Sequence, residues 1–182
     1  SAFSMYAHMG THIDALNHFG LNGKIYNGFR ADTALGDRGW TKAGAETIPE
    51  IIARGVMLDI AKIKNVSQLS GGYRITRNDI IEAAKKQKIS LKKGDVVLLR
   101  TGRMQNFYDA ETYMNNSPGL GLGAAKYLAD QGAMIIGADN LSLEAFPSEL
   151  KSDYVPVHTY LLAQKGIPII ELVNLESLAE SA

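Results

Sequence analysis

Short apolar runs alternate along the chain with amphipathic segments, and this alternation predicts the order of the structural elements. Four runs are typical of strands buried in a sheet: residues 55–60, 96–99, 133–137 and 167–171. Helical patterns lie between or after them: a helix that Thr76 opens with Asp79 in its first turn, residues 121–131, a helix that Pro156 starts, and residues 174–180. Strands that alternate with helices indicate an α/β domain with a core of parallel strands.

The segment 20–49 interrupts this alternation. It is rich in Gly, Asn and Asp and has few apolar runs, so it predicts long loops. Besides Phe29, three aromatic residues in or beside it follow a cluster of histidines: Phe19, Tyr26 and Trp40. They are candidates for the wall of a substrate pocket, and the alternative is that they anchor the loop to the core.

Composition narrows the class of protein. At 182 residues and 46% hydrophobic content, the chain predicts one domain spanning residues 1–182. Nineteen basic and nineteen acidic residues give no electrostatic footprint for nucleic acid or an anionic membrane. The absence of cysteine excludes disulfides, thiolate zinc sites and cysteine nucleophiles. No apolar run approaches the roughly 20 residues that span a bilayer, and we expect a cytoplasmic protein with a small-molecule substrate.

The sequence gives little support for two other kinds of chemistry, nucleotide binding and serine hydrolysis. Residues 119–124 fit the loose G-x-G-x-x-A nucleotide pattern, but Asn, Ser and Pro precede them in place of a strand, so a turn before a helix is the better interpretation. The chain contains no G-x-S-x-G elbow, which leaves a serine hydrolase poorly supported.

The strongest chemical signal is the segment 8–18. It holds His8, His12 and His18, three of the four histidines of the chain, together with Asp14. Neutral imidazole and carboxylate are ligands for a divalent metal such as zinc, manganese or iron. The alternative is that these are separate surface or capping histidines.

The spacing within this segment is compatible with one metal site. Gly10 and its neighbours make a poor helix interior, so we expect extended chain. On an extended chain, the Cα atoms of His12 and Asp14 lie about 7 Å apart, and their side chains can share an ion. His8 joins them if the chain bends at Gly10, and a turn then carries His18 back over the site.

The segment HMGTHIDALNHF also matches the H-x-G-T-H-x-D-x-x-x-H-F signature of the metal-dependent cyclase and kynurenine-formamidase-like hydrolases, which include isatin hydrolases. Three further segments resemble that family: GDVVLLRTG at residues 94–102, Gly137-Ala138-Asp139 with Ser142 and Glu144, and the stretch from Val157-His158 to Asn174-Leu175. The resemblance covers nearly the whole chain. It implies a single domain with a swivelling β/β/α-type fold and a mixed, partly parallel sheet.

The resemblance also implies a set of metal ligands. His8, His12 and Asp14 match the positions that hold the ion, and His158 and Glu171 match positions that bind a second ion with the shared Asp in formamidase members. Some relatives use one metal, so we expect one or two Mn or Zn ions per chain. Independently, a carboxylate at Glu171, directly after two isoleucines, is costly to bury without a metal or a hydrogen-bonded proton. His158 alone could equally be a core histidine.

The implied activity is hydrolysis of the C–N bond of a small aryl or cyclic amide, isatin-like, by a metal-activated water. His18 would be the catalytic residue that carries the proton from that water to the leaving nitrogen. Asp139 either orients a ligand histidine or caps the turn after strand 133–137. The alternatives are an arylformamidase acting on N-formylkynurenine-like substrates, a metal-dependent lyase or dehydratase, and a binding protein without turnover. We also expect a homo-oligomer, a dimer or a tetramer.

The chain departs from the family in one respect. Family members carry a further N-terminal segment before the signature, whereas here the signature begins at His8. We therefore expect either that this chain is a fragment of a longer one, or that a strand which the family normally uses to line the site is missing.

Overall fold

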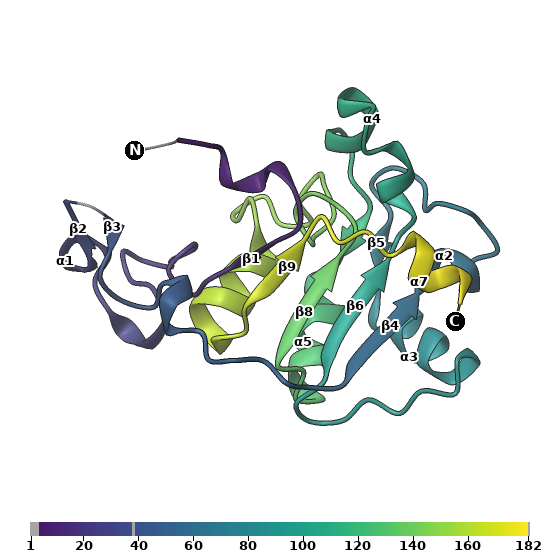
Figure 1. Cartoon of the computed structure of the whole chain (residues 1–182), viewed down its shortest axis with the longest axis horizontal. Helices are drawn as coiled ribbons and strands as arrows, with labels where there is room; N and C mark the ends of the chain where they lie inside the picture. Colours follow the sequence, from purple (N-terminus) through teal and green to yellow (C-terminus); the bar gives the residue numbers. More distant parts are fainter. Residues whose placement is uncertain (1–3, 38, 182) are drawn as a thin grey trace.

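A five-stranded mixed sheet forms the centre of the molecule (Figure 1). The computed structural model describes residues 4–37 and 39–181. The strand order across the sheet is β1 (His12–Asp14), β9 (Ile169–Glu171), β8 (Ile135–Ala138), β6 (Val96–Arg100) and β4 (Gly55–Asp59). The last four strands run parallel to their neighbours, and β1 pairs antiparallel with β9. The predicted α/β fold with a mixed, partly parallel sheet is confirmed.

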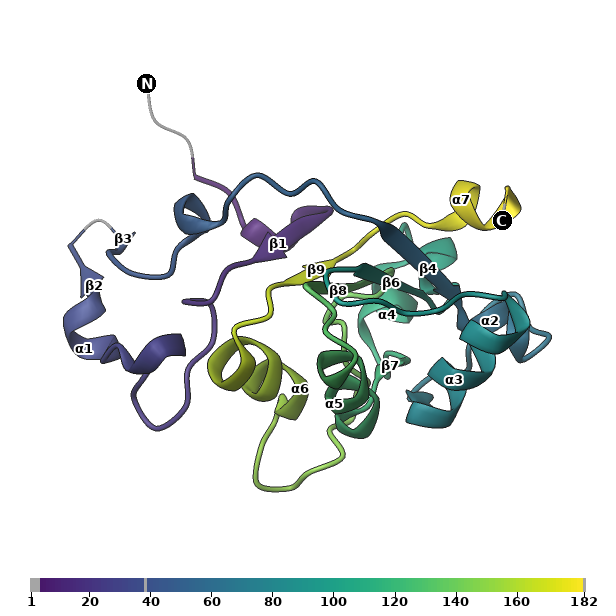
Figure 2. The same cartoon turned by 90° about the horizontal axis from the view of Figure 1, so that it is seen from below.

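Three helices cover one face of this sheet: α3 (Arg77–Lys86), α5 (Leu122–Asp130) and α6 (Pro156–His158) (Figure 2). Helix α3 begins as the sequence predicts, because Thr76 and Asp79 form a capping box in which each side chain accepts from the other's backbone N–H. Helix α6 begins at Pro156 and continues as a π-helical segment, Thr159–Lys165, which the sequence pattern did not predict. The remaining helices are short: α1 (Ala31–Ala34), α2 (Ile60–Ile63), α4 (Ala110–Met114) and α7 (Glu176–Glu180).

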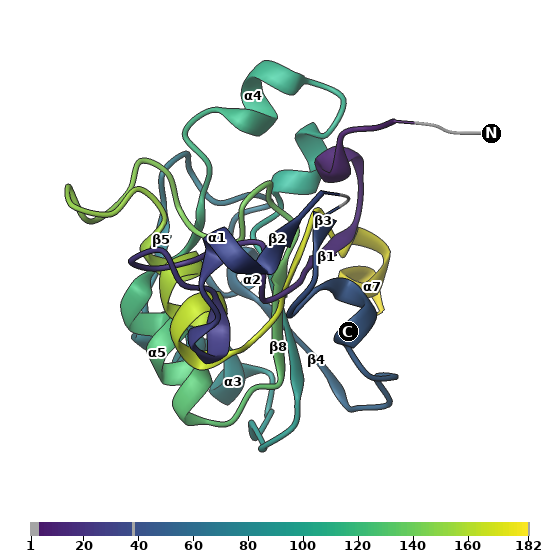
Figure 3. The ribbon, with the colours of Figure 1, turned by 90° about the vertical axis from the view of Figure 1, so that its left-hand side faces the viewer.

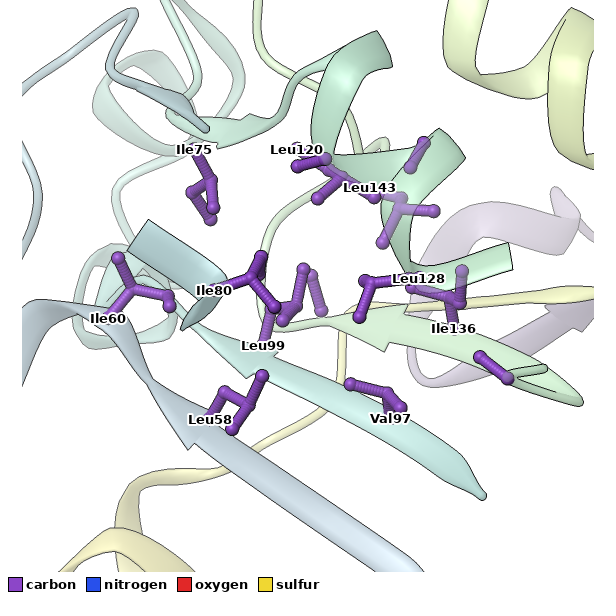
Figure 4. Close-up of a cluster of buried hydrophobic side chains, with 14 of the residues drawn as sticks. Leu58, Ile60, Ile75, Ile80, Val97, Leu99, Leu120, Leu128, Ile136 and Leu143 are labelled. Atoms are coloured by element: carbon purple, nitrogen blue, oxygen red, sulfur yellow. The ribbon is translucent and has the colours of Figure 1, made fainter. Parts of the chain in front are cut away.

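The core lies between the sheet and these helices (Figure 4). Leu58, Leu99 and Ile136 point from three adjacent strands toward Ile80 of α3 and Leu128 of α5, and all five are fully buried. The apolar runs predicted as strands therefore supply the sheet side of the core. Among the described residues, no helix is both long and apolar enough to cross a membrane.

The segment 20–49 lies at one end of the molecule, beside β1, while β4 and the C-terminus lie at the other end (Figures 1 and 3). As predicted, it consists mostly of loops. They carry the short helix α1, two 3-10 turns (Tyr26–Gly28 and Ala45–Thr47) and a small hairpin of β2 (Leu35–Gly36) and β3 (Gly39–Trp40). A third two-stranded pairing, of β5 (Arg74–Ile75) with β7 (Gly119–Leu120), lies apart from the main sheet.

Candidate metal centre

The pairing of β1 with β9 builds the framework of the site. In the antiparallel register His12 lies opposite Glu171, and Asp14 lies opposite Ile169. Directly opposed residues share a face of the sheet, as do residues two apart on one strand. His12, Asp14 and Glu171 therefore project from the same face, although more than 150 positions separate the two strands in the sequence.

His8 joins them through a bend in the chain, as predicted. It lies in a 3-10 turn, Ala7–Met9, and the chain bends at Gly10 and Thr11 before β1 begins at His12. The 3-10 turn that precedes Gly10 was not predicted. The turn brings His8 Nδ1 to 3.4 Å from Glu171 Oε2.

The first group of potential ligands is His8, His12, Asp14 and Glu171. Each residue offers one ligand atom, and these atoms all lie within 4.8 Å of one another. His12 Nε2 is 3.5 Å from Asp14 Oδ1 and 3.3 Å from Glu171 Oε2. Two imidazoles and two carboxylates that converge in this way match the donor preference of zinc or manganese.

A second group lies on the other side of the same carboxylates. A turn in which His18 N donates to Ala15 O returns His18 to the site, as predicted, with its Nε2 3.7 Å from Asp14 Oδ2. His158 Nε2 lies 4.0 Å from Asp14 Oδ2 and 3.3 Å from Glu171 Oε1. Asp14 and Glu171 thus each turn one oxygen toward the first group and the other toward the second.

The electrostatics of the site fit a bound cation. Asp14 and Glu171 are 5% and 1% exposed. Of the four buried side-chain atoms without a hydrogen-bond partner in the described part of the chain, three belong to this site: His12 Nε2, Asp14 Oδ2 and Glu171 Oε1. Burial raises the pKa of Asp14, and the negative charge of Glu171 raises it further. Unsatisfied buried polar atoms are rare in folded proteins and indicate a missing partner. A divalent cation at the first group would satisfy His12 Nε2, and one at the second group would satisfy the two carboxylate oxygens.

His18 differs from the other histidines in exposure. Its side chain is 37% exposed, against 7% for that of His158. Burial of the remainder lowers the pKa of His18, and the neighbouring Asp14 opposes this shift only in part. A neutral His18 at the rim of the site could accept a proton at neutral pH.

His158 is oriented by a residue to which the sequence analysis assigned no role. Its Nδ1 lies 2.5 Å from Glu144 Oε1, and Glu144 also accepts from the backbone N–H groups of Val157 and His158. Burial alone would lower the pKa of His158, but the hydrogen bond to Glu144 and the nearby negative charge of Glu171 outweigh it and raise the pKa to about 9. One signal was present in the sequence: Glu144 stands between Leu143 and Ala145, where burial of a carboxylate requires a partner.

Asp139 was expected either to orient a histidine or to cap a turn. Its carboxylate accepts from the backbone N–H groups of Thr101 and Gly102 and from the Thr101 hydroxyl. No hydrogen bond joins it to a histidine within the described part of the chain, so the orienting interaction belongs to Glu144 instead. Complete burial raises the pKa of Asp139 to about 6, although these hydrogen bonds oppose the shift. Asp139 ties the carboxyl end of β8 to the chain that follows β6.

The three aromatic candidates have different surroundings. The ring of Phe19 packs edge-on against His158, with ring centroids 5.9 Å apart. Tyr26 packs over Gly166, where an added Cβ would collide with its ring, so Tyr26 anchors the loop to the end of the π-helical segment. Trp40 lies in the β2–β3 hairpin at the end of the molecule (Figure 3), and none of the ring contacts found among the described residues joins it to a histidine.

Comparison with known proteins places these features in a family. The family described as "Putative cyclase" matches residues 1–145. A solved novel cyclase is 34% identical, with a TM-score of 0.88 over 98% of this chain and 60% of its own. Isatin hydrolase A from Ralstonia solanacearum is 20% identical, with a TM-score of 0.73 over 97% of this chain and 63% of its own.

A potential metal-dependent hydrolase with cyclase activity is 23% identical, with a TM-score of 0.56 over 96% of this chain and 65% of its own. No protein with a curated function matches the chain. The chain thus spans less than two thirds of each of these solved relatives, and at these identities the two hydrolases show a shared fold. Since the family match covers most of the sequence, including every residue of the 8–18 motif, the chain belongs to the cyclase family.

Proposed function

We propose that the chain carries the site of a metal-dependent hydrolase that cleaves the C–N bond of a small cyclic or aryl amide. One observation carries this proposal: Asp14 and Glu171 each lie between two sets of histidines, and buried atoms of both carboxylates lack hydrogen-bond partners. The structural likeness to isatin hydrolases supports a cyclic amide substrate.

The residues divide into two cation positions. His8 and His12 with one oxygen each of Asp14 and Glu171 would hold the first, and His158 with the other two oxygens would hold the second. Manganese and zinc both suit this donor set. A bound divalent cation would supply Lewis acidity, which makes a water more acidic and polarises a carbonyl oxygen.

His18 would move the proton. It is the most exposed histidine of the site, its lowered pKa keeps it neutral at pH 7, and Asp14 lies beside its Nε2. It would accept a proton from the attacking water and return it to the leaving nitrogen, as a general base and then a general acid. Phe19, packed against His158, would form part of the apolar wall beside the substrate.

The test combines metal analysis with a substrate panel. The purified chain is loaded with Mn²⁺ or Zn²⁺ and assayed with isatin and with aryl formamides in ¹⁸O-labelled water. Hydrolysis incorporates the label into the product acid. Turnover of an aryl formamide alone would indicate an arylformamidase, and turnover without label would indicate a lyase. A chain that binds no divalent cation would contradict the proposal.

A further inference from the structure

We infer that Glu144 is a positioning residue that fixes the orientation and the tautomer of His158, and thereby creates the second cation position. The inference rests on the proposed function, since it assigns how one ligand of that site is aimed. Glu144 is 2% exposed and His158 is 6% exposed, so neither side chain can exchange its partner for bulk water.

Both oxygens of Glu144 are committed to the start of α6. Oε1 accepts from His158 N at 3.0 Å and faces Nδ1 of the same residue at 2.5 Å, while Oε2 accepts from Val157 N at 3.2 Å. Because an ionised carboxylate can only accept, the hydrogen of this contact must be on Nδ1. His158 Nε2 is the nitrogen that faces Asp14 and Glu171, and with the other hydrogen held on Nδ1 it is the nitrogen that would bind a cation in place of a proton.

Glu144 is itself fixed by the backbone around it. Leu120 of β7 donates its N–H to Leu143 O at 2.8 Å and accepts from Ala145 N at 3.2 Å, which pins the residues on either side of Glu144. Leu143 adopts φ 54°, a region that leucine seldom occupies. A carboxylate on such a rigid segment can direct a ring in the way that outer carboxylates direct metal-bound histidines.

A purely structural role predicts a different outcome, and Asp79 provides the comparison. Asp79 is also a buried carboxylate that accepts backbone hydrogen bonds at a helix start, in its case α3. Its side-chain contacts are with Lys64 and Tyr73, and none with a histidine is found among the described residues. Asp79→Asn is therefore a matched control for Glu144→Gln. Both variants remove the charge of a buried helix-capping carboxylate, and only Glu144→Gln disturbs a candidate ligand.

The first readout requires no metal. In the metal-free wild-type chain with ¹⁵N-labelled histidine, NMR should show one strongly downfield Nδ1–H proton from His158, bonded to Glu144. The resonance should disappear in Glu144→Gln and persist in Asp79→Asn. If Glu144→Gln does not fold, the wild-type spectrum alone decides, because a His158 with an unprotonated Nδ1 would overturn the inference.

The second readout is calorimetric titration with Zn²⁺ alone. Glu144→Gln should bind the first equivalent like the wild type and the second 10- to 100-fold more weakly, the usual effect of losing an outer-shell partner. Asp79→Asn should bind both like the wild type. Unchanged binding of both ions by Glu144→Gln would overturn the inference. A wild-type chain that binds no ion would instead contradict the proposed function, and the NMR result would still decide the role of Glu144.

Discussion

Two clusters of buried charge lie at the carboxyl ends of the strands, and they differ in the source of their positive charge. In the first, Arg100 at the end of β6 bonds to Asp59 at the end of β4 at 3.0 Å and to Glu176 of α7 at 2.8 Å. These hydrogen bonds raise the pKa of Arg100, chiefly through Glu176, despite its burial. This cluster contains its own permanent cation, and it ties α7 to the sheet.

The second cluster, at the end of β9, contains no permanent cation within the described part of the chain. Asp14 and Glu171 face four histidines, whose charge depends on pH, and buried atoms of both carboxylates remain without hydrogen-bond partners. The comparison teaches that burial of charge alone does not identify a functional site. The informative feature is a cluster of buried carboxylates whose negative charge can be balanced only by a cation from outside the chain.

The largest effect is expected from removing a central ligand. His12→Ala should abolish tight binding at the first cation position and reduce activity to background, because Nε2 of His12 lies between both carboxylates. The fold should persist, since His12 is only half-buried on the edge strand β1. Metal content by elemental analysis, with circular dichroism as the control for folding, checks this. An unchanged metal content would contradict the ligand assignment.

A smaller effect is expected at the rim of the site. His18→Ala should retain the bound cation but lower kcat by roughly 10²–10⁴, the usual range for the loss of a general acid–base. The partial exposure of His18 supports a proton carrier over an essential ligand. The measurement is kcat together with metal content on the same sample. Loss of metal along with activity would show that His18 is a ligand.

A mutation in the first cluster, that of Arg100, should lower the stability of the protein and leave its metal binding unchanged. Arg100→Met leaves the buried Asp59 without its arginine partner, and breaking such a pair costs about 3–5 kcal/mol. Because Glu176 is 29% exposed and can regain water, we expect about 3 kcal/mol in urea denaturation. The cation stoichiometry of the variant should equal that of the wild type. Loss of metal from Arg100→Met would contradict the claim that the two clusters differ in function.

The smallest effect concerns pH in the metal-free chain. The pKa of His158 is raised in the folded state from 6.5 to about 9, so its contribution to stability is fully present below pH 6.5 and is lost as the pH rises through 9. We expect a decrease of about 1–3 kcal/mol in the free energy of unfolding across this window. With saturating Zn²⁺ the trend should reverse, because the metal competes with the proton. A flat profile in both conditions would contradict the account of His158.

The sequence predicted the local parts of the site. The two-residue spacing of His12 and Asp14 favours extended chain, and the turn that returns His18 follows within four residues. The apolar strands and the capped start of α3 could also be predicted from the sequence, because each depends on periodicity or on a cap within one segment.

The remaining parts of the site depend on long-range pairing. No local sequence pattern indicates that His12 lies opposite Glu171. This register is set only when β1 pairs with β9 in the sheet. The choice between the two roles expected of Asp139 could not be made from the sequence for a similar reason. Asp139 and Glu144 are both buried acids after β8, and only the packing of α6 determines which of them meets His158. The bend at Gly10 was predicted, but the 3-10 turn before it, which brings His8 to Glu171, has no local signature in the sequence.

The central claim is that Asp14 and Glu171 are shared between two cation positions, and the most direct measurement is a Mn²⁺ titration of the metal-free chain followed by electron paramagnetic resonance. The account predicts two ions per chain, with a spin-coupled signal at saturation. In Glu171→Gln it predicts the loss of at least one ion, because a neutral amide is a weak ligand for such cations. Saturation of the wild type at one ion per chain, without a weaker second event, would contradict it.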